Sequence, residues 1–280
     1  MELQPSIAQL LDWAYQQLAG GESPKLDARI LLSHCLDKDI SYLITWPEKI
    51  PDGKVVEQFK QFVTKRQSGY PIAYLVGFRG FWTLQLQVSE HTLIPRPETE
   101  LLVETALTLT LPEKAKVLDL GTGTGAIALS LASERANWLI SGVDCIAEAV
   151  VLAQSNAKLN QITTVDFYQS DWFSQVDDAN FDLIVSNPPY VEAQSEYLSK
   201  GDVKFEPLSA LTSGTDGLDD IKQIVNAASH YLKTGGYLLL EHGFNQSEKI
   251  ARLLKQHKFT EIEHRHDLNG LLRVSLGKLA

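Results

Sequence analysis

The sequence predicts an α/β fold in which a mostly parallel sheet, covered by helices on both faces, follows a small helical N-terminal domain. Three observations support this. The first seventy residues carry apolar side chains at three- and four-residue intervals, which is the period of a helix. From residue 116 onward, strand-like runs alternate with helical segments, the rhythm of a parallel sheet. Residues 261–276 read as two strands around Asn269-Gly270, which predicts an antiparallel C-terminal edge.

Three helices are expected in the N-terminal domain. The first covers the apolar positions of residues 7–18 and stops at the two glycines that follow. The second holds the apolar positions of residues 28–36. The third begins at Asp52, a residue type that commonly caps helix N-termini, and ends near Gly69. We therefore expect a small helical domain over residues 1–70.

Residues 71–97 are expected to form a linker that contains a hairpin. Aromatic residues and alternating apolar residues flank two glycines in its first half, a pattern typical of paired strands. The linker runs into Ile-Pro-Arg-Pro-Glu-Thr-Glu at 94–100, whose two prolines stiffen the entry into a helix over residues 98–109. The sheet domain is then expected to span residues 98–280.

Strand-like and helical segments alternate through the sheet domain. Parallel strands need such crossover helices, so the alternation predicts helices on both faces of the sheet. The expected strands are 116–120, 138–144, 165–171, 181–187 and 237–243, and the expected helices are 125–134, 147–157, 219–231 and 246–255.

The charge balance argues against broad capture of nucleic acid. The 280 residues include 25 Lys and Arg against 35 Asp and Glu, a net charge of −10. Non-specific phosphate binding depends on Lys and Arg that release counterions. We therefore expect no stable nucleic-acid binding.

Cysteine usage and the N-terminus predict a cytoplasmic protein. Cys35 and Cys145 are the only cysteines, and neither lies in a metal-ligand spacing, so we expect reduced thiols. The N-terminus carries Glu2 where a secretory leader has basic residues, and no apolar run has the length of a membrane span. No membrane association is expected.

A glycine-rich turn at residues 121–125 follows the first strand of the sheet domain. Glycines let the backbone turn sharply and approach a ligand, while the following helix offers free N–H groups. Asp144 ends the next strand, nineteen residues beyond Gly125, where a carboxylate can accept from both hydroxyls of a ribose. This order of strand, turn, helix, strand and acid predicts a nucleoside-bearing cofactor.

The details of the turn favour S-adenosylmethionine. The dinucleotide fingerprint G-x-G-x-x-G is not met, because Ala126 stands where its last glycine would be, which disfavours an NAD oxidoreductase. Asp119 before G-x-G-x-G suits a smaller ligand with a zwitterionic end. Trp172, after the third strand, is a candidate to contact the adenine or the sulfonium, since aromatic faces attract cations. Asp171 is a weaker candidate for the adenine amino group.

Asn187-Pro188-Pro189-Tyr190 is the most specific motif. It follows the strand at 181–187, and ligands in open α/β sheets bind at the carboxyl ends of strands. The prolines hold the chain extended, so that the Asn187 side-chain oxygen and the Pro188 carbonyl can accept from the two N–H bonds of a planar amine. The nitrogen lone pair then faces a methyl donor, and Tyr190 covers the flat group. Positioning carries the rate, and no strong base is required.

These motifs resemble a known family. The catalytic half resembles S-adenosylmethionine-dependent methyltransferases with a Rossmann-like seven-strand fold, in which this tetrapeptide marks methylation of planar nitrogens. Together with the helical N-terminus, the chain resembles the bacterial release factor glutamine methyltransferases over essentially its whole length, least over its two ends. The segments that carry the resemblance are 94–100, 119–132, 170–173, 186–190, 201–211 and 238–243.

The resemblance implies a reaction, a partner and a set of site residues. It implies methyl transfer from S-adenosylmethionine to the side-chain amide nitrogen of the glutamine in the Gly-Gly-Gln motif of class I peptide chain release factors, with residues 1–70 docking the protein. A sister family modifies a ribosomal protein, and Pro-Arg-Pro-Glu-Thr-Glu favours release factors. Asn187, Pro188, Pro189 and Tyr190 would hold the glutamine, with Asn187 catalytic. The residues implied in cofactor contact are Gly121, Thr122, Gly123, Thr124, Gly125, Asp144, Trp172 and Asn187.

Two other classes of function stay open. A nucleic-acid amino methyltransferase would use the same tetrapeptide on adenine or guanine, but it would need a basic track for the backbone. A non-catalytic binding module is disfavoured because the glycine turn and the tetrapeptide are both intact.

Several histidines and charged residues are candidates for metal binding, a structural role or contact with a partner. His264 and His266 share a strand face, but no third ligand is evident, so no metal site is predicted. His242 and Glu241 end the strand at 237–243, where a packing or hydrogen-bonding role is expected for the histidine and Glu241 would shape the cleft. Arg96 either meets the incoming protein loop or pairs with an acid at 98 or 100, and the sequence favours neither.

Overall fold

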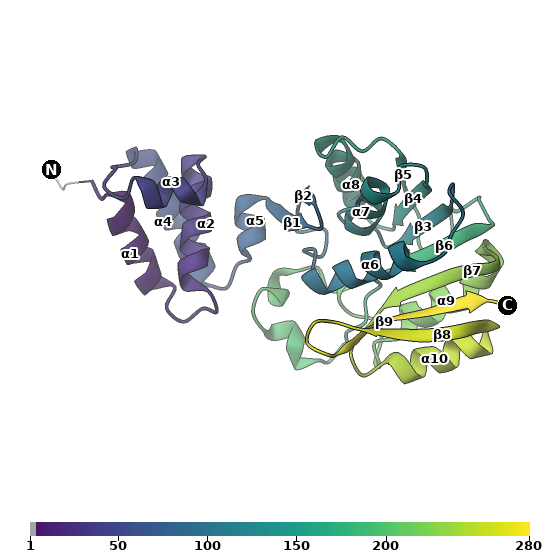
Figure 1. Cartoon of the computed structure of the whole chain (residues 1–280). Coiled ribbons are helices and arrows are strands. Elements are labelled where there is room, and N and C mark those ends of the chain that lie inside the picture. Colours follow the sequence, from purple (N-terminus) through teal and green to yellow (C-terminus); the bar gives the residue numbers. More distant parts are fainter. Residues whose placement is uncertain (1–3) are drawn as a thin grey trace. The chain divides into compact units, whose positions relative to one another are not determined.

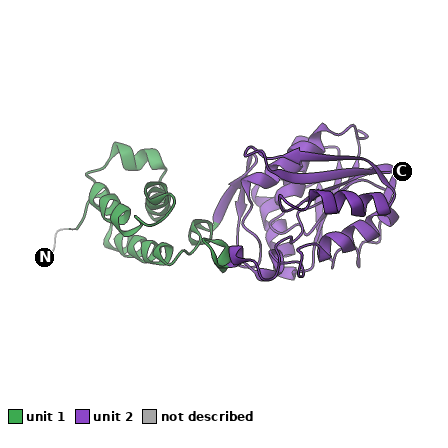
Figure 2. Ribbon diagram, turned by 90° about the horizontal axis from the view of Figure 1, so that it is seen from below, with its two compact units in different colours: residues 1–77, 199–205 green, residues 78–198, 206–280 purple. Residues whose placement is uncertain are grey.

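The computed structural model describes residues 4–280, which divide into two compact units (Figure 2). The helical unit contains the chain up to Gly77 together with Ser199–Phe205, and the sheet unit contains Phe78–Leu198 and Glu206–Ala280. Glu2, on which the expectation about a secretory leader depends, lies outside the described residues. The predicted linker at 71–97 is divided, because residues 71–77 belong to the helical unit and residues 78–97 to the sheet unit.

The helical unit contains the three predicted helices and two short ones. Asp52 caps the third predicted helix, where its carboxylate accepts from the backbone N–H of Lys54 at 2.8 Å. The two additional helices have six and five residues, too few turns to show helical periodicity in the sequence. The helices of this unit are α1 (Ile7–Gln17), α2 (Pro24–Leu36), α3 (Ile40–Thr45), α4 (Gly53–Gln67) and α5 (Ile72–Val76).

The helical unit has its own apolar core and holds a distant segment of the chain. Side chains such as Leu31 and Phe59 are fully buried in this core. Arg66, near the end of α4, donates to Asp27 of α2 at 2.8 Å and to Asp202 at 2.6 Å. These two ion pairs connect residues 199–205 to α2 and α4, although that segment lies more than 130 residues further along the chain.

The sheet unit is built on seven strands in the order β5-β4-β3-β6-β7-β9-β8 (Figure 1). Strands β5, β4, β3, β6 and β7 are parallel, and β9 is antiparallel to both of its neighbours. The mostly parallel sheet and the antiparallel C-terminal pair are therefore confirmed, but β9 lies between β7 and β8, so that β8 forms the edge. The strands are β3 (Lys116–Leu120), β4 (Leu139–Asp144), β5 (Val165–Gln169), β6 (Phe181–Ser186), β7 (Leu232–Glu241), β8 (Phe259–His266) and β9 (Leu272–Leu279).

Helices cover both faces of this sheet. Alternate residues of β3 separate into two apolar cores, with Val117 in one and Leu118 in the other. Side chains of α6, α7 and α8 pack in the first core and side chains of α9 and α10 in the second. The bounds of these helices are α6 (Glu100–Thr108), α7 (Ala126–Glu134), α8 (Ala147–Leu159), α9 (Asp219–Tyr231) and α10 (Ser247–Gln256).

A separate hairpin, β1 (Phe78–Phe81) and β2 (Leu84–Gln87), packs on the first core. Its turn lies at Trp82 and the next residue, not at a glycine, and Trp82 has a positive φ of 55°. Short 3-10 helices occupy Pro97–Thr99, Glu196–Ser199, Val203–Phe205 and Leu208–Ala210. No helix in residues 4–280 is long and apolar enough to cross a membrane.

Candidate functional site

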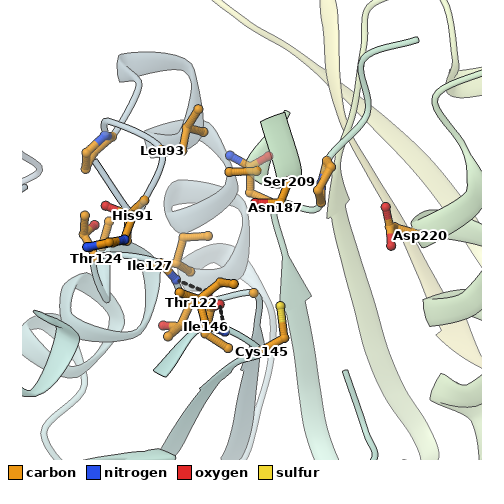
Figure 3. Close-up of a pocket in the computed structure, with 18 of the residues that line it drawn as sticks. His91, Leu93, Thr122, Thr124, Ile127, Cys145, Ile146, Asn187, Ser209 and Asp220 are labelled. Carbon is orange, nitrogen blue, oxygen red and sulfur yellow. Dashed lines mark hydrogen bonds between the residues drawn. The ribbon is translucent and has the colours of Figure 1, made fainter. Parts of the chain in front are cut away.

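A pocket of the sheet unit lies where the strand order reverses. The chain runs outward from β3 through β4 to β5 on one side, and starts again at β6 on the other side of β3. Ligands of open α/β sheets bind outside the carboxyl ends of the strands at such a switch point. The pocket is lined by residues that follow β3, β4, β5 and β6, and in Figure 3 Asn187 and Ser209 lie at its upper end and Cys145 and Ile146 at its lower end.

The glycine turn needs its glycines for two different reasons. Gly121 and Gly125 have φ of 69° and 82°, in the left-handed region that favours glycine. A Cβ on Gly121 would lie 3.4 Å from the Trp172 ring, whereas a Cβ on Gly125 would lie 3.1 Å from both Leu129 and Phe167. Gly121 therefore keeps the pocket open beside the tryptophan, and Gly125 allows α7 to pack on the sheet. Gly125 is not among the described residues that line the pocket.

Asp144, at the end of β4, lines the pocket and fixes its walls. Its Oδ2 accepts from the backbone N–H of Gly123 at 2.9 Å, and its Oδ1 accepts from that of Ile146 at 3.0 Å. Burial raises the pKa of Asp144, and these backbone hydrogen bonds oppose the shift. A carboxylate oxygen can accept two hydrogen bonds, so both oxygens of Asp144 can still accept from a ligand.

Asp119 lies beneath the glycine turn, and it is not among the described residues that line the pocket. It is fully buried, and its Oδ2 accepts from the Thr122 hydroxyl at 2.6 Å and from the Ala128 N–H at 3.2 Å. Its Oδ1 has no partner among the described residues. Burial raises the pKa of Asp119 to about 7. This acid holds the turn from below and does not face the space a ligand would occupy.

Trp172 and Asp171 follow β5 and both line the pocket. Trp172 has a φ of 48°, an uncommon conformation for a residue with a side chain. Its carbonyl accepts from the Ser170 hydroxyl at 2.8 Å, which holds this bend. The bend sets the tryptophan ring next to Gly121.

Only two residues of the Asn187–Tyr190 segment line the pocket. Asn187 and Pro189 line it, while Pro188 is buried and Tyr190 packs into the second apolar core. The Asn187 Nδ2 donates to the Thr99 hydroxyl at 3.1 Å. Tyr190 is not among the described residues that line the pocket, and its ring packs against the second apolar core.

Glu241, at the end of β7, lies behind this segment. The Tyr190 hydroxyl donates to its Oε1 at 3.3 Å, and the Thr99 hydroxyl favours the ionised form of this carboxylate. Burial raises the pKa of Glu241 to about 7, and the two hydroxyls oppose the shift. Burial also raises the pKa of Tyr190, so its phenol stays protonated.

His242 and His264 share one hydroxyl of the C-terminal strands. His242 is buried, its Nδ1 pairs with the Gly243 carbonyl at 2.8 Å and its Nε2 with the Ser275 hydroxyl at 2.7 Å. Burial lowers the pKa of His242 to about 4, so the ring is neutral at pH 7. His264 pairs with the same hydroxyl at 2.8 Å. Residues 4–280 contain no group of three or more side chains that could hold a metal ion.

Arg96 pairs with an acid that the sequence did not indicate. Its guanidinium donates to Oε1 of Glu206, whose side chain is fully buried, and Glu206 Oε2 accepts from the Ile94 N–H at 3.0 Å. Both expected partners, at 98 and 100, are therefore wrong. Glu206 ties the segment at 94–96 to the loop that contributes Ser209 and Ala210 to the pocket.

Sequence reasoning also missed part of the pocket wall. Thr99 was inside a motif that the sequence singled out, but its side chain was not assigned a role. Pro95 belongs to the same motif, Ser209 and Ala210 lie in the 201–211 segment, and Asp220 lies in α9. Residues 91–93 lie in a loop without a recognisable pattern, and Cys145 and Ile146 follow Asp144. These residues are His91, Thr92, Leu93, Pro95, Cys145, Ile146, Ser209, Ala210 and Asp220.

Two family models match the chain. The Methyltransferase small domain matches residues 97–201, and the PrmC N-terminal domain matches residues 9–77. The first match contains the glycine turn, Asp144 and the Asn187–Tyr190 segment, and the second falls within the helical unit.

Relatives with high identity extend over almost the full chain. A release factor glutamine methyltransferase from Shewanella oneidensis is 50% identical over 276 residues, which is 98% of this chain and 96% of that protein. Proteins of the same name from Pseudomonas aeruginosa and Escherichia coli are 48% and 44% identical, over 94% and 95% of this chain and 96% of each protein.

Solved methyltransferase structures share the fold at low identity. A methyltransferase from Pyrococcus furiosus has a TM-score of 0.54 at 18% identity, over 77% of this chain and 95% of that one. A 16S rRNA methyltransferase from T. thermophilus has a TM-score of 0.52 at 22% identity, over 72% of this chain and 50% of that one.

Proposed function

This chain belongs to the release factor glutamine methyltransferase family, and on that premise we propose that it methylates the glutamine of the Gly-Gly-Gln motif in class I peptide chain release factors. The methyl group would come from S-adenosylmethionine and go to the side-chain amide nitrogen. The observation that carries the proposal is the position of Asn187, which lines a pocket at the switch point of the sheet beside the glycine turn.

The chemistry of the lining fits S-adenosylmethionine. Asp144 offers a carboxylate with spare acceptor capacity, as a ribose diol requires. Gly121 leaves space next to the Trp172 ring that a Cβ would fill. When bound, the cofactor supplies a methyl group on a positively charged sulfur. Residues 121–124, Asp144 and Trp172 would hold it, whereas Gly125 would act through the packing of α7.

The substrate end of the pocket suits a planar amide. Asn187 would accept one amide N–H through its Oδ1, and the Pro188 carbonyl would accept the other. With both hydrogens engaged, the nitrogen lone pair would be free to take the methyl group, and the nitrogen would release one proton to water after transfer. Because the nitrogen is neutral and the leaving sulfur neutralises its own charge, these residues act by orientation and not as strong bases.

The helical unit would bind the release factor itself. It has an independent core, and it corresponds to a separately recognised N-terminal domain of the family. Surface recognition by this unit would supply affinity, so that only the glutamine and small neighbours need to enter the pocket. We place the reaction in the cytoplasm, in keeping with the two unpaired cysteines.

The test is to incubate the enzyme with methyl-labelled cofactor and one of three substrates. These are a class I release factor, its Gln→Ala variant at the Gly-Gly-Gln motif, and total RNA. We expect label in the intact release factor and none in the other two. Label in RNA, or equal label in the Gln→Ala variant, would overturn the proposal.

A further inference from the structure

We propose that Thr99 and Glu241 are positioning residues that fix the orientation of the Asn187 side-chain amide. Together they hold its NH2 group away from the substrate, so that its oxygen faces the glutamine amide. This inference rests on the proposed function, because it concerns how Asn187 comes to act as a hydrogen-bond acceptor.

The asparagine amide has two ends of similar shape and opposite hydrogen-bonding character. Only the Oδ1 end can accept from a substrate N–H; a rotation by 180° would present two donors to a group that is itself a donor. Asn187 alone therefore does not specify an acceptor site. Some neighbour has to distinguish its two ends, and the neighbour in contact is the Thr99 hydroxyl, which receives a hydrogen bond from Nδ2 at 3.1 Å.

Thr99 can distinguish the two ends only if its own proton is already committed. A hydroxyl has one proton to donate and two lone pairs that accept. The Thr99 hydroxyl favours the ionised form of Glu241, as a donor does, because an ionised carboxylate can only accept. The Thr99 proton therefore points to Glu241, and the Thr99 oxygen is left to accept. The only group of Asn187 that satisfies it is the NH2 group.

The environment of Glu241 suits this task. The carboxylate is fully buried on β7, where water cannot compete for it, and its Oε1 also accepts from Tyr190 at 3.3 Å. Its Oε2 has no partner within residues 4–280. The carboxylate thus acts on Asn187 indirectly, through Thr99, and contacts Tyr190 directly. Both ends of the tetrapeptide therefore depend on one buried acid.

Protonation of Glu241 would reverse the chain of hydrogen bonds. A proton on Oε2 would find no acceptor, whereas a proton on Oε1 would donate to Thr99. Thr99 would then donate to Asn187, which would turn its NH2 group toward the substrate. The charged groups that act on Glu241 are Arg273, which favours ionisation, and Glu98, which opposes it.

The first test compares variants of Thr99. We expect Thr99→Val, which keeps the shape but removes the hydroxyl, to lower kcat by up to about 100-fold while the affinity for cofactor stays unchanged. Thr99→Ser should restore most of the rate, because it restores the hydroxyl. Thr105→Val is the matched control on α6, since that buried hydroxyl bonds only to the Leu101 carbonyl at 2.7 Å. Wild-type kcat in Thr99→Val would overturn the inference.

The second test is the pH profile, which a purely structural role would leave unchanged. In the wild type, kcat should rise as pH increases through about 7, where Glu241 ionises. Glu241→Gln removes the titration, so the ratio of kcat at pH 8 to kcat at pH 6 should fall toward one. If the rise through pH 7 persists in Glu241→Gln, another buried acid such as Asp119 controls it, and the inference fails.

These outcomes are separable from failure of the proposed function. If the wild type transfers no methyl group to a release factor, the proposed function is wrong. If the wild type is active and Asn187→Ala is not, but Thr99→Val and Glu241→Gln behave as the wild type does at every pH, the function stands and the positioning role is excluded.

Discussion

The two ends of the pocket each depend on a buried carboxylate, and the two acids work differently. Asp119 beneath the glycine turn and Glu241 behind Asn187 are both fully buried, and each has one oxygen without a partner among the described residues. Burial raises the pKa of each to about 7. Asp119 bonds to Thr122 and to the backbone of Ala128, close in sequence, whereas Glu241 bonds to side chains of Thr99 and Tyr190, far from it in sequence.

This difference teaches how each end is specified. The cofactor end is a single strand, turn and helix whose backbone is fixed by an acid within the same motif. The substrate end is assembled from the 3-10 helix before α6, the residues after β6, and β7, and its geometry depends on side chains that hold other side chains. Both acids should therefore affect stability, but changes at the first end should act through the backbone, whereas changes at the second end should also alter the rate.

The largest effect concerns stability and compares the two acids directly. A carboxyl whose folded pKa is raised contributes stability that is fully present below its unfolded pKa of about 4 and is lost as pH rises through about 7. In the wild type, each carboxyl should lower the free energy of unfolding by up to about 4 kcal/mol between pH 4 and pH 7. Asp119→Asn and Glu241→Gln should each abolish one of these two decreases. Denaturant unfolding at pH 4.5, 6 and 8 measures it.

The pH-dependent contribution of His242 to stability does not affect this comparison. His242 has a lowered folded pKa of about 4, so it contributes stability that increases as pH rises toward its unfolded value of about 6.5. The wild type and both variants share this contribution, which cancels in their difference. If both variants follow the wild-type dependence on pH, the two carboxyls do not titrate as their burial implies.

The next effect is on catalysis. Asn187→Ala should reduce methyl transfer on the order of 10²- to 10³-fold, because one acceptor of the substrate amide is lost at the moment of attack. The circular dichroism spectrum should remain close to wild type. A rate within a few-fold of wild type would show that the amide is held by other groups.

An effect on cofactor binding is expected at the other end. Asp144→Ala should weaken S-adenosylmethionine binding by roughly 1.5 to 3 kcal/mol for each charge-assisted hydrogen bond that is lost. Isothermal titration calorimetry measures this, with Asp178→Ala as a control because Asp178 is an exposed acid whose ion pair is with Lys116. Unchanged affinity in a folded Asp144→Ala protein contradicts the assignment.

The smallest effect tests the packing role of Gly125. Gly125→Ala should destabilise the fold by about 1 to 3 kcal/mol, since the residue has a φ of 82° and its new Cβ would approach Leu129 and Phe167 to 3.1 Å. Gly20→Ala is the control, because a Cβ there has no atom within 4 Å. Thermal unfolding that does not distinguish the two variants would argue against this role.

The sequence by itself determined the local parts of this protein. The period of apolar residues located the longer helices and the parallel strands, because each pattern is repeated within one element. The glycine turn, Asp144 and Asn187 were recognised because a backbone that turns sharply, or that stays extended, requires particular residue types at fixed spacing.

Only the tertiary structure decided which distant side chains meet. Glu206 pairs with Arg96, and Thr99 stands between Asn187 and Glu241, although none of these partners is near the other in sequence. The position of β9 between β7 and β8 is also decided by tertiary packing. Strand order and the paths of loops arise from packing across the whole unit, and a hydrogen bond between side chains has no period that a sequence displays. The role of Glu241 at the substrate end of the pocket is therefore decided by its neighbours in space.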